Sequence, residues 1–173
     1  MSDGSELIFN EVQQFRQPLL WILFCVICVI TIFVIYFVLK KLTNARKKSK
    51  VVVISSVTPI VIIILIAVLL FIAKLEVQVR PGGISVRFFP LHFSFEEIPF
   101  EKIKEYRQVT FSPISDYGGW GIRYGSKGKA YIVSGEKGVL LKFKDGSDDL
   151  CIGSQQPEQL FAVLDGLKKS GSK

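Results

Sequence analysis

Two long apolar stretches, PLLWILFCVICVITIFVIYFVL (Pro18–Leu39) and VVVISSVTPIVIIILIAVLLFIA (Val51–Ala73), decide what kind of protein this is. Neither stretch contains a charged residue. As α-helices, each would be about 33 Å long, enough to cross a hydrocarbon core of about 30 Å. A buried helical hairpin of a soluble protein is the alternative, but such helices rarely lack ionisable residues over this length. The sequence therefore predicts two transmembrane helices, because neither stretch has the short apolar core and small-residue cleavage site of a signal peptide.

The two predicted helices divide the 173 residues into three parts. Residues 1–17 form a polar N-terminal tail, and residues 18–73 form a transmembrane hairpin with spans at 18–39 and 51–73. Residues 74–173 remain for one domain, and about a hundred residues are enough for its own hydrophobic core. Within the tail, Ile8, Val12 and Phe15 follow helical spacing, which favours a short interfacial helix. A disordered tail is the alternative.

The net charge of +7 is concentrated between the two predicted spans. The loop at 40–50 contains six basic residues and no acidic one: Lys40, Lys41, Arg46, Lys47, Lys48 and Lys50. Because basic residues in short loops favour the cytoplasm, we expect a multi-pass cell-membrane protein with this loop inside. Both termini, and the C-terminal domain, are then outside the cell. The charge indicates topology, and it does not indicate nucleic-acid binding.

The C-terminal part predicts a run of short antiparallel strands followed by one helix. Alternating apolar residues and turn residues place strands at 75–80, 84–89, 93–98, 103–110, 120–124, 130–133, 139–143 and 150–152. Pro157 suits the first position of a helix that ends at Gly171. Its apolar stripe is expected to cover the open face of the sheet. The stripe consists of Leu160, Phe161, Val163, Leu164 and Leu167.

This order of elements, with several short motifs, resembles a pleckstrin-homology-like (PH-like) barrel. The motifs are Tyr117–Arg123, Ala130-Tyr131, Ser134-Gly135, Gly138-Val139, Ile152-Gly153-Ser154 and Pro157–Leu160. From about Phe9 to Leu167 the chain is similar to an uncharacterised prokaryotic family, bacterial and archaeal, in which two transmembrane helices precede such a domain. The resemblance implies a membrane α-helical hairpin plus an α+β, largely all-β, PH-like barrel of antiparallel strands capped by the C-terminal helix. It implies no catalytic residue.

Histidine and cysteine offer little catalytic chemistry in this sequence. His92 is the only histidine, which argues against His-based metal sites and His–Asp dyads. Cys25 and Cys28 lie inside the first predicted span, and Cys151 is alone in the C-terminal domain. Paired cysteines in a membrane helix are more often small apolar residues than a metal or redox site. We expect no metal and no cofactor.

The acidic pairs and the glycine-rich run add no catalytic site. The neighbours in Glu96-Glu97 and in Asp148-Asp149 lie on predicted strands, so their side chains point to opposite faces. The run Gly118–Gly121 lacks the Gly-Lys-Ser/Thr ending of a phosphate-binding loop. We therefore predict that the protein is not an enzyme, and a hydrolase of unknown type is the least favoured alternative.

The segment Asp116–Arg123 is the strongest candidate for an interaction surface. Tyr117, Trp120 and Arg123 are of the types that dominate interface energetics, and three glycines accompany them. Alternatively, Trp120 is a core residue and the glycines shape a corner of the barrel. We favour the core for Trp120, which would continue an inward alternation with Ile122 and Tyr124, and an outward, exposed position for Arg123.

Together these features predict a non-enzymatic, membrane-tethered PH-like module for interaction or scaffolding. Lipid surrounds its spans, and a protein partner in the membrane makes it a subunit of a larger assembly. A lipid-headgroup or small-ligand sensor that uses Arg80, Arg87 and Arg123 is the alternative. PH domains that bind phosphoinositides concentrate basic residues around the first hairpin, whereas here only Arg80 and Arg87 lie there. This difference argues against headgroup recognition by that route.

Overall fold

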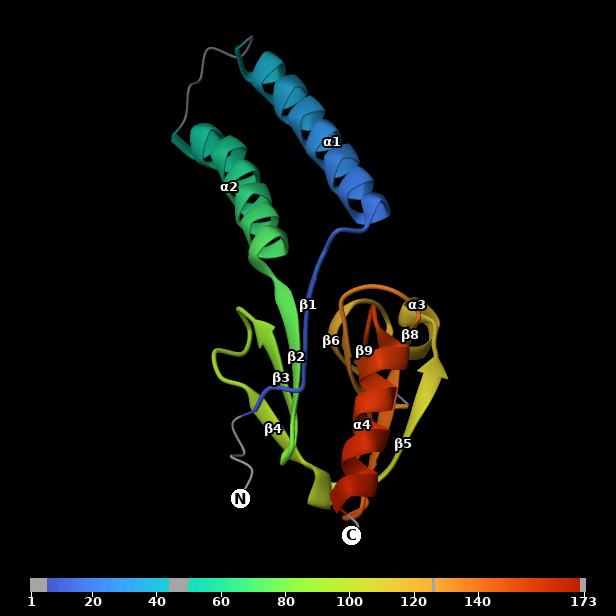
Figure 1. Cartoon of the computed structure of the whole chain (residues 1–173). Coiled ribbons are helices and arrows are strands. Elements are labelled where there is room, and N and C mark those ends of the chain that lie inside the picture. Colours follow the sequence, from blue (N-terminus) through green and yellow to red (C-terminus); the bar gives the residue numbers. More distant parts are fainter. Residues whose placement is uncertain (1–5, 44–49, 126, 172–173) are drawn as a thin grey trace. The chain divides into compact units, whose positions relative to one another are not determined.

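A computed structural model describes residues 6–43, 50–125 and 127–171 (Figure 1). The chain forms two compact units. One is the helical unit, Arg16–Ile72, and the other is an α+β domain built from the residues on both sides of it. Most of the basic loop predicted at 40–50, namely residues 44–49, lies outside the described residues.

The helical unit consists of α1 (Pro18–Thr43) and α2 (Lys50–Ile72), with Pro59 inside α2. Within the described part of the chain, one helix is long and apolar enough to cross a membrane, at Pro18–Lys41. None of its apolar window is buried by the protein. The described apolar part of α2, Val57–Ile72, is shorter. A helix that is apolar on every side and yet uncovered needs an apolar environment other than this chain's own core.

The α+β domain contains two sheets. Sheet A has the order β1-β2-β3-β4, with β1 at Phe9–Gln14, β2 at Lys74–Arg80, β3 at Gly83–Phe89 and β4 at Glu96–Pro99. Sheet B has the order β5-β8-β9-β7-β6, with β5 at Ile103–Thr110, β6 at Gly121–Gly125, β7 at Gly128–Ile132, β8 at Lys137–Phe143 and β9 at Leu150–Gly153. The helices are η1 (Phe100–Lys102), α3 (Pro113–Tyr117) and α4 (Pro157–Gly171).

Strand β1 corrects the expectation of an interfacial helix or disordered tail. It pairs antiparallel with β2 along its whole length, from Phe9 opposite Val79 to Gln14 opposite Lys74. Its inward side chains include Glu11 and Gln13, both buried. Because polar residues point into the domain here, the strand lacks the inward apolar alternation that predicts strands from sequence. Strand β1 therefore belongs to sheet A of the α+β domain.

Strand β9 corrects the expectation of a purely antiparallel meander. It lies between β8, to which it is antiparallel, and β7, to which it is parallel. The cause is that β8 pairs with β5 and not with β7, so the hairpin β8–β9 fills the space beside β7. Gly138 is opposite Gly153 in this hairpin, and a Cβ at Gly138 would collide with the backbone carbonyl of Ile152. Glycine is therefore required where these backbones approach closely.

The inner face of sheet B, which turns toward sheet A, carries the main core. Tyr131 and Leu141 on this face are completely buried. The stripe of α4 behaves as predicted at Leu160 and Leu164, which are each 1% exposed. On the same face, the Glu96 carboxylate of sheet A accepts hydrogen bonds from Lys129 and Tyr131 of sheet B. The two sheets and α4 thus close one core between them.

Candidate functional site

The outer face of sheet B, which points away from sheet A, is the candidate site. Register places one row of side chains across it: Arg107, Leu140, Cys151, Ala130 and Arg123. The row begins and ends with an arginine on an edge strand, and its middle is apolar. With strands about 4.8 Å apart, the two arginines are about 19 Å from each other. Within the described residues neither arginine makes an ion pair, and both are exposed.

A short roof covers the middle of this row. Ser112 caps the start of α3, and Gly118 ends it in a left-handed conformation. The sequence patterns placed no helix or strand between the predicted strands at 103–110 and 120–124. The rings of Phe111 and Tyr117 lie edge to face, with centroids 5.8 Å apart. They form a small second core with Leu140 and its buried neighbours, against which Trp120 packs.

Tyr117, predicted as an interface residue, is buried in this roof. Its hydroxyl interacts electrostatically with the thiol of the buried Cys151. Burial raises the pKa of Tyr117 far above its ordinary value, and burial also raises the pKa of Cys151 to about 11. The thiol is therefore protonated at neutral pH, which makes it a poor nucleophile.

Trp120 and Arg123 differ in exposure: Trp120 is half-buried and Arg123 is exposed. Trp120 is half-buried against the outer face, so the expectation that it enters the barrel with Ile122 and Tyr124 is wrong. Gly121 interrupts the alternation at φ +99°, and Tyr124 is 75% exposed. Arg123 is exposed, as predicted. A Cβ at Gly119 would come within 3.3 Å of its guanidinium, so glycine keeps this position free for it.

Beside the roof, the outer face contains an open cavity of about 560 Å³. Its floor is apolar, with Val109 and Leu140, and its rim is charged. The charged and polar side chains that line the cavity are Arg107, Thr110, Asp116, Lys127, Ser147, Asp148 and Asp149. Asp116 and Lys127 form an ion pair of 2.8 Å across it. The cavity therefore offers both signs of charge around an apolar floor, which suits a ligand or side chain of mixed character.

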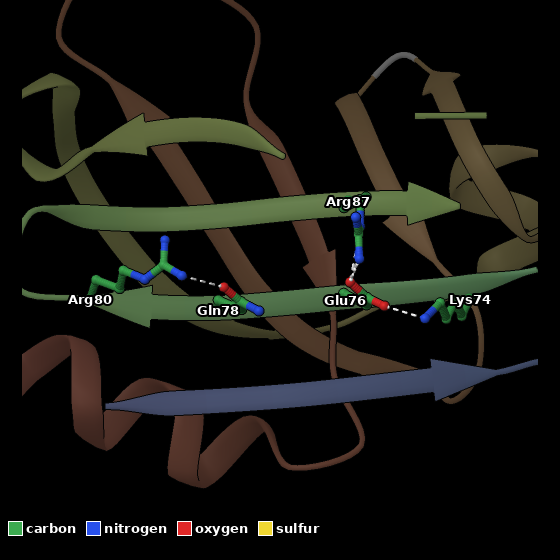
Figure 2. Close-up of polar contacts among 5 residues, drawn as sticks. All are labelled: Lys74, Glu76, Gln78, Arg80 and Arg87. Atoms are coloured by element: carbon green, nitrogen blue, oxygen red, sulfur yellow. Dashed lines mark hydrogen bonds and ion pairs between the residues drawn. The ribbon is translucent and has the colours of Figure 1, made fainter. Parts of the chain in front are cut away.

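Arg80 and Arg87, the other predicted site residues, lie on the outer face of sheet A (Figure 2). Arg87 donates hydrogen bonds to the buried carboxylate of Glu76, and Lys74 forms an ion pair of 2.6 Å with the same group. Burial opposes ionisation of Glu76, but these two cations hold its pKa below the ordinary value. Arg80 donates to the side-chain oxygen of Gln78. Arg87 is thus committed to an internal ion pair.

Among the described residues of the outer face, the one thiol, that of Cys151, is buried and its pKa is raised. Among the described residues, no group of three or more His, Cys, Asp or Glu side chains could hold a metal. Glu96 and Glu97 point to opposite sides of β4, as predicted, since they pair with Val86 and Ser85. Sequence reasoning missed Arg107 and Lys127. The alternation of β5 could have placed Arg107 outward with Val109, but no local pattern links it to the loops that form the cavity.

Comparison with known proteins places the chain in a family and assigns it no activity. No curated protein and no solved structure matches it significantly. A family model matches residues 2–162, which include β1, both helices of the helical unit and both sheets. This match confirms the expectation that the chain belongs to an uncharacterised family. The chain belongs to a family of unknown function (DUF6141).

Proposed function

We propose that this protein is a non-enzymatic interaction module anchored in a membrane by two helices. The pairing of β1 with β2 carries the proposal. Gln14 lies opposite Lys74, so the helical unit begins and ends at neighbouring strands of one sheet. A chain that leaves a folded domain and returns to the same sheet crosses a membrane an even number of times. If α1 crosses, α2 crosses as well, and both termini are on one side.

The same strand opposes a cleaved signal sequence. Removal of α1 with everything before it would also remove β1. The Glu11 carboxylate accepts hydrogen bonds of 2.6 Å from the Ser154 hydroxyl and from the backbone N–H of Gln155. Gln13 donates to the carbonyl of Gly153 at 2.7 Å. Cleavage would remove all three hydrogen bonds and uncover the edge of β2 with which β1 pairs.

We further propose that the domain is a variant of the PH-like fold. Two sheets that face each other and one C-terminal helix that closes their core support this kinship. The parallel pair β7–β9 and the N-terminal strand placed before the membrane helices are its departures.

Orientation follows from the basic loop, so the domain is extracytoplasmic in this proposal. The test uses full-length protein with one tag at either terminus or in the loop at 40–50. Protease added to intact cells should remove both terminal tags and spare the loop tag. Protection of both terminal tags until lysis would mean that the domain is cytoplasmic. Cleavage of one terminal tag and protection of the other would exclude the hairpin.

The outer face of sheet B is the proposed surface for a protein partner in the membrane. The Trp120 ring is half-buried against this face, and Arg123 is an exposed cation on the same face. Tryptophan and arginine are enriched among the residues that contribute most of the binding energy in protein interfaces. The test is purification of the tagged full chain in mild detergent, with the variant Arg123→Glu and the control Lys144→Glu, an equal charge change at an exposed turn. A partner retained by both variants would exclude this surface.

A sensor of small ligands or lipid headgroups is the second candidate, and the cavity beside Arg107 favours it. Arg123 lies at the far end of the same row, whereas Arg87 is already paired with Glu76. In nanodiscs of varied headgroup, native mass spectrometry would detect a retained ligand. Loss of that ligand in Arg107→Glu, with retention in Lys144→Glu, would favour the sensor over the scaffold.

A further inference from the structure

The loop between β3 and β4, Pro90–Phe95, presents apolar side chains to solvent. Leu91 is 67% exposed and Phe93 is 80% exposed, among the most exposed large apolar side chains of the α+β domain. The ring of Phe93 lies edge to face against Phe89, with centroids 6.2 Å apart. Exposure of adjacent large apolar side chains on a folded domain usually marks an interaction surface.

Covalent connection places this loop close to the end of α2. Phe89, the last residue of β3, pairs with Lys74, the first residue of β2. Lys74 is two residues from Ile72, where α2 ends, and two residues extend at most about 7 Å. Paired Cα atoms in an antiparallel ladder are about 5 Å apart. The loop therefore starts next to the point where the chain leaves the helical unit, whatever the orientation of the domain.

The chemistry of the loop is that of a membrane interface. Lys74 lies 6.0 Å from the centre of the Phe89 ring, and Arg87 lies 4.4 Å from the centre of the Phe95 ring. Aromatic rings beside long cationic side chains are typical of the headgroup boundary. A stable protein interface buries about 800 Å² on each partner, far more than two projecting side chains can supply.

We infer that the loop Pro90–Phe95 inserts Leu91 and Phe93 into the outer boundary of the lipid bilayer. It is a third membrane contact besides the two helices, and it fixes the tilt of the domain on the membrane. The inference rests on the proposed function, because it takes the end of α2 as the membrane boundary.

The test places the photoreactive residue p-benzoylphenylalanine at one position at a time in the full chain. The chain is in nanodiscs of phosphatidylethanolamine and phosphatidylglycerol. Position 93 tests the loop, and position 65, on the exposed surface of α2, tests the membrane span. Position 8 is the matched control, because Ile8 is also an exposed apolar residue. Its backbone N–H donates a hydrogen bond to the carbonyl of Val79, which lies about 17 Å along β2 from Lys74. Unchanged thermal unfolding shows that each substituted chain is folded.

After irradiation, intact-mass analysis should find a several-fold greater yield of phospholipid adduct at positions 93 and 65 than at position 8. Adduct at 65 but not at 93 would overturn the inference and leave the membrane hairpin standing. Absence of adduct at 65 would overturn both. Equal yields at 93 and 8, or capture of a second copy of the chain at 93, would also overturn lipid insertion.

Discussion

The two faces of sheet B are built from the same strands and are covered in different ways. On the inner face, Tyr131 and Leu141 are fully buried under regular elements, sheet A and α4. On the outer face, Leu140 and Cys151 are buried under a five-residue helix and its flanking loop, and an open cavity remains beside them. Regular elements cover an apolar face completely, whereas a loop leaves room for another molecule. We therefore expect substitutions on the inner face to change stability, and those on the outer face to change recognition.

The largest effect is expected for Leu164→Ala, which removes a buried side chain of α4 from the inner core. Loss of a buried leucine leaves a cavity and costs about 2–5 kcal/mol. Thermal unfolding of the full chain in detergent, followed by near-ultraviolet circular dichroism, measures this loss. Gln159→Ala on the exposed side of the same helix is the control, and an equally small shift for both variants would contradict the role of α4 as the cover of this core.

Trp120→Ala tests the roof of the outer face. A fully buried tryptophan would cost about 3–5 kcal/mol, so this half-buried one should cost about 2 kcal/mol. The same unfolding experiment measures it, and Trp120→Phe should recover most of the loss. A cost as large as that of Leu164→Ala would mean that the two faces are equally important for stability.

Acid should weaken the polar link between the sheets. Burial opposes ionisation of Glu96, but the hydrogen bonds from Lys129 and Tyr131 hold its pKa below the ordinary value. A lowered pKa in the folded state gives stability that is complete above the ordinary pKa of about 4.3 and is lost as pH falls through the folded value. Melting temperatures of wild type and Glu96→Gln should therefore converge at low pH. Parallel curves at all pH values would show that the link contributes nothing.

The smallest effect on stability is expected for Arg123→Ala. An exposed side chain with no ion pair in the described part of the chain should change the free energy of unfolding by less than about 0.5 kcal/mol. Its effect should instead appear as loss of the partner in detergent purification. A large fall in melting temperature would assign Arg123 to the structure and remove it from the proposed surface.

Local patterns were sufficient for most elements of the α+β domain. The predicted strand at 103–110 and the predicted helix at 157–171 coincide with β5 and α4. The helix has an apolar period that matches one partner face, so the pattern and the packing agree there. In β5, by contrast, Tyr106 packs against α4 and Val109 lies on the outer face. The buried stripe at Leu160 and Leu164 and the exposure of Arg123 follow from the same periods.

Local patterns failed where a remote partner replaces the usual apolar contact. Strand β1 buries Glu11 because Ser154 and Gln155, far along the chain, donate hydrogen bonds to its carboxylate. Trp120 turns to the outer face because Gly121 adopts a positive φ, which breaks the alternation of the strand that follows. For β1 the deciding partners lie far along the chain, whereas for Trp120 the backbone conformation of the next residue decides.

By itself the sequence determined the apolar helices, most of the strands that follow them and the final helix, since these depend on composition and local period. Tertiary structure alone decided that β1 pairs with β2 across the helical unit, that β9 enters between β8 and β7, and that Arg107 and Arg123 lie in one row. These features depend on which strand edge is free to accept a partner. An edge is defined only once the other strands are in place, because backbone hydrogen bonds form with any sequence that reaches it.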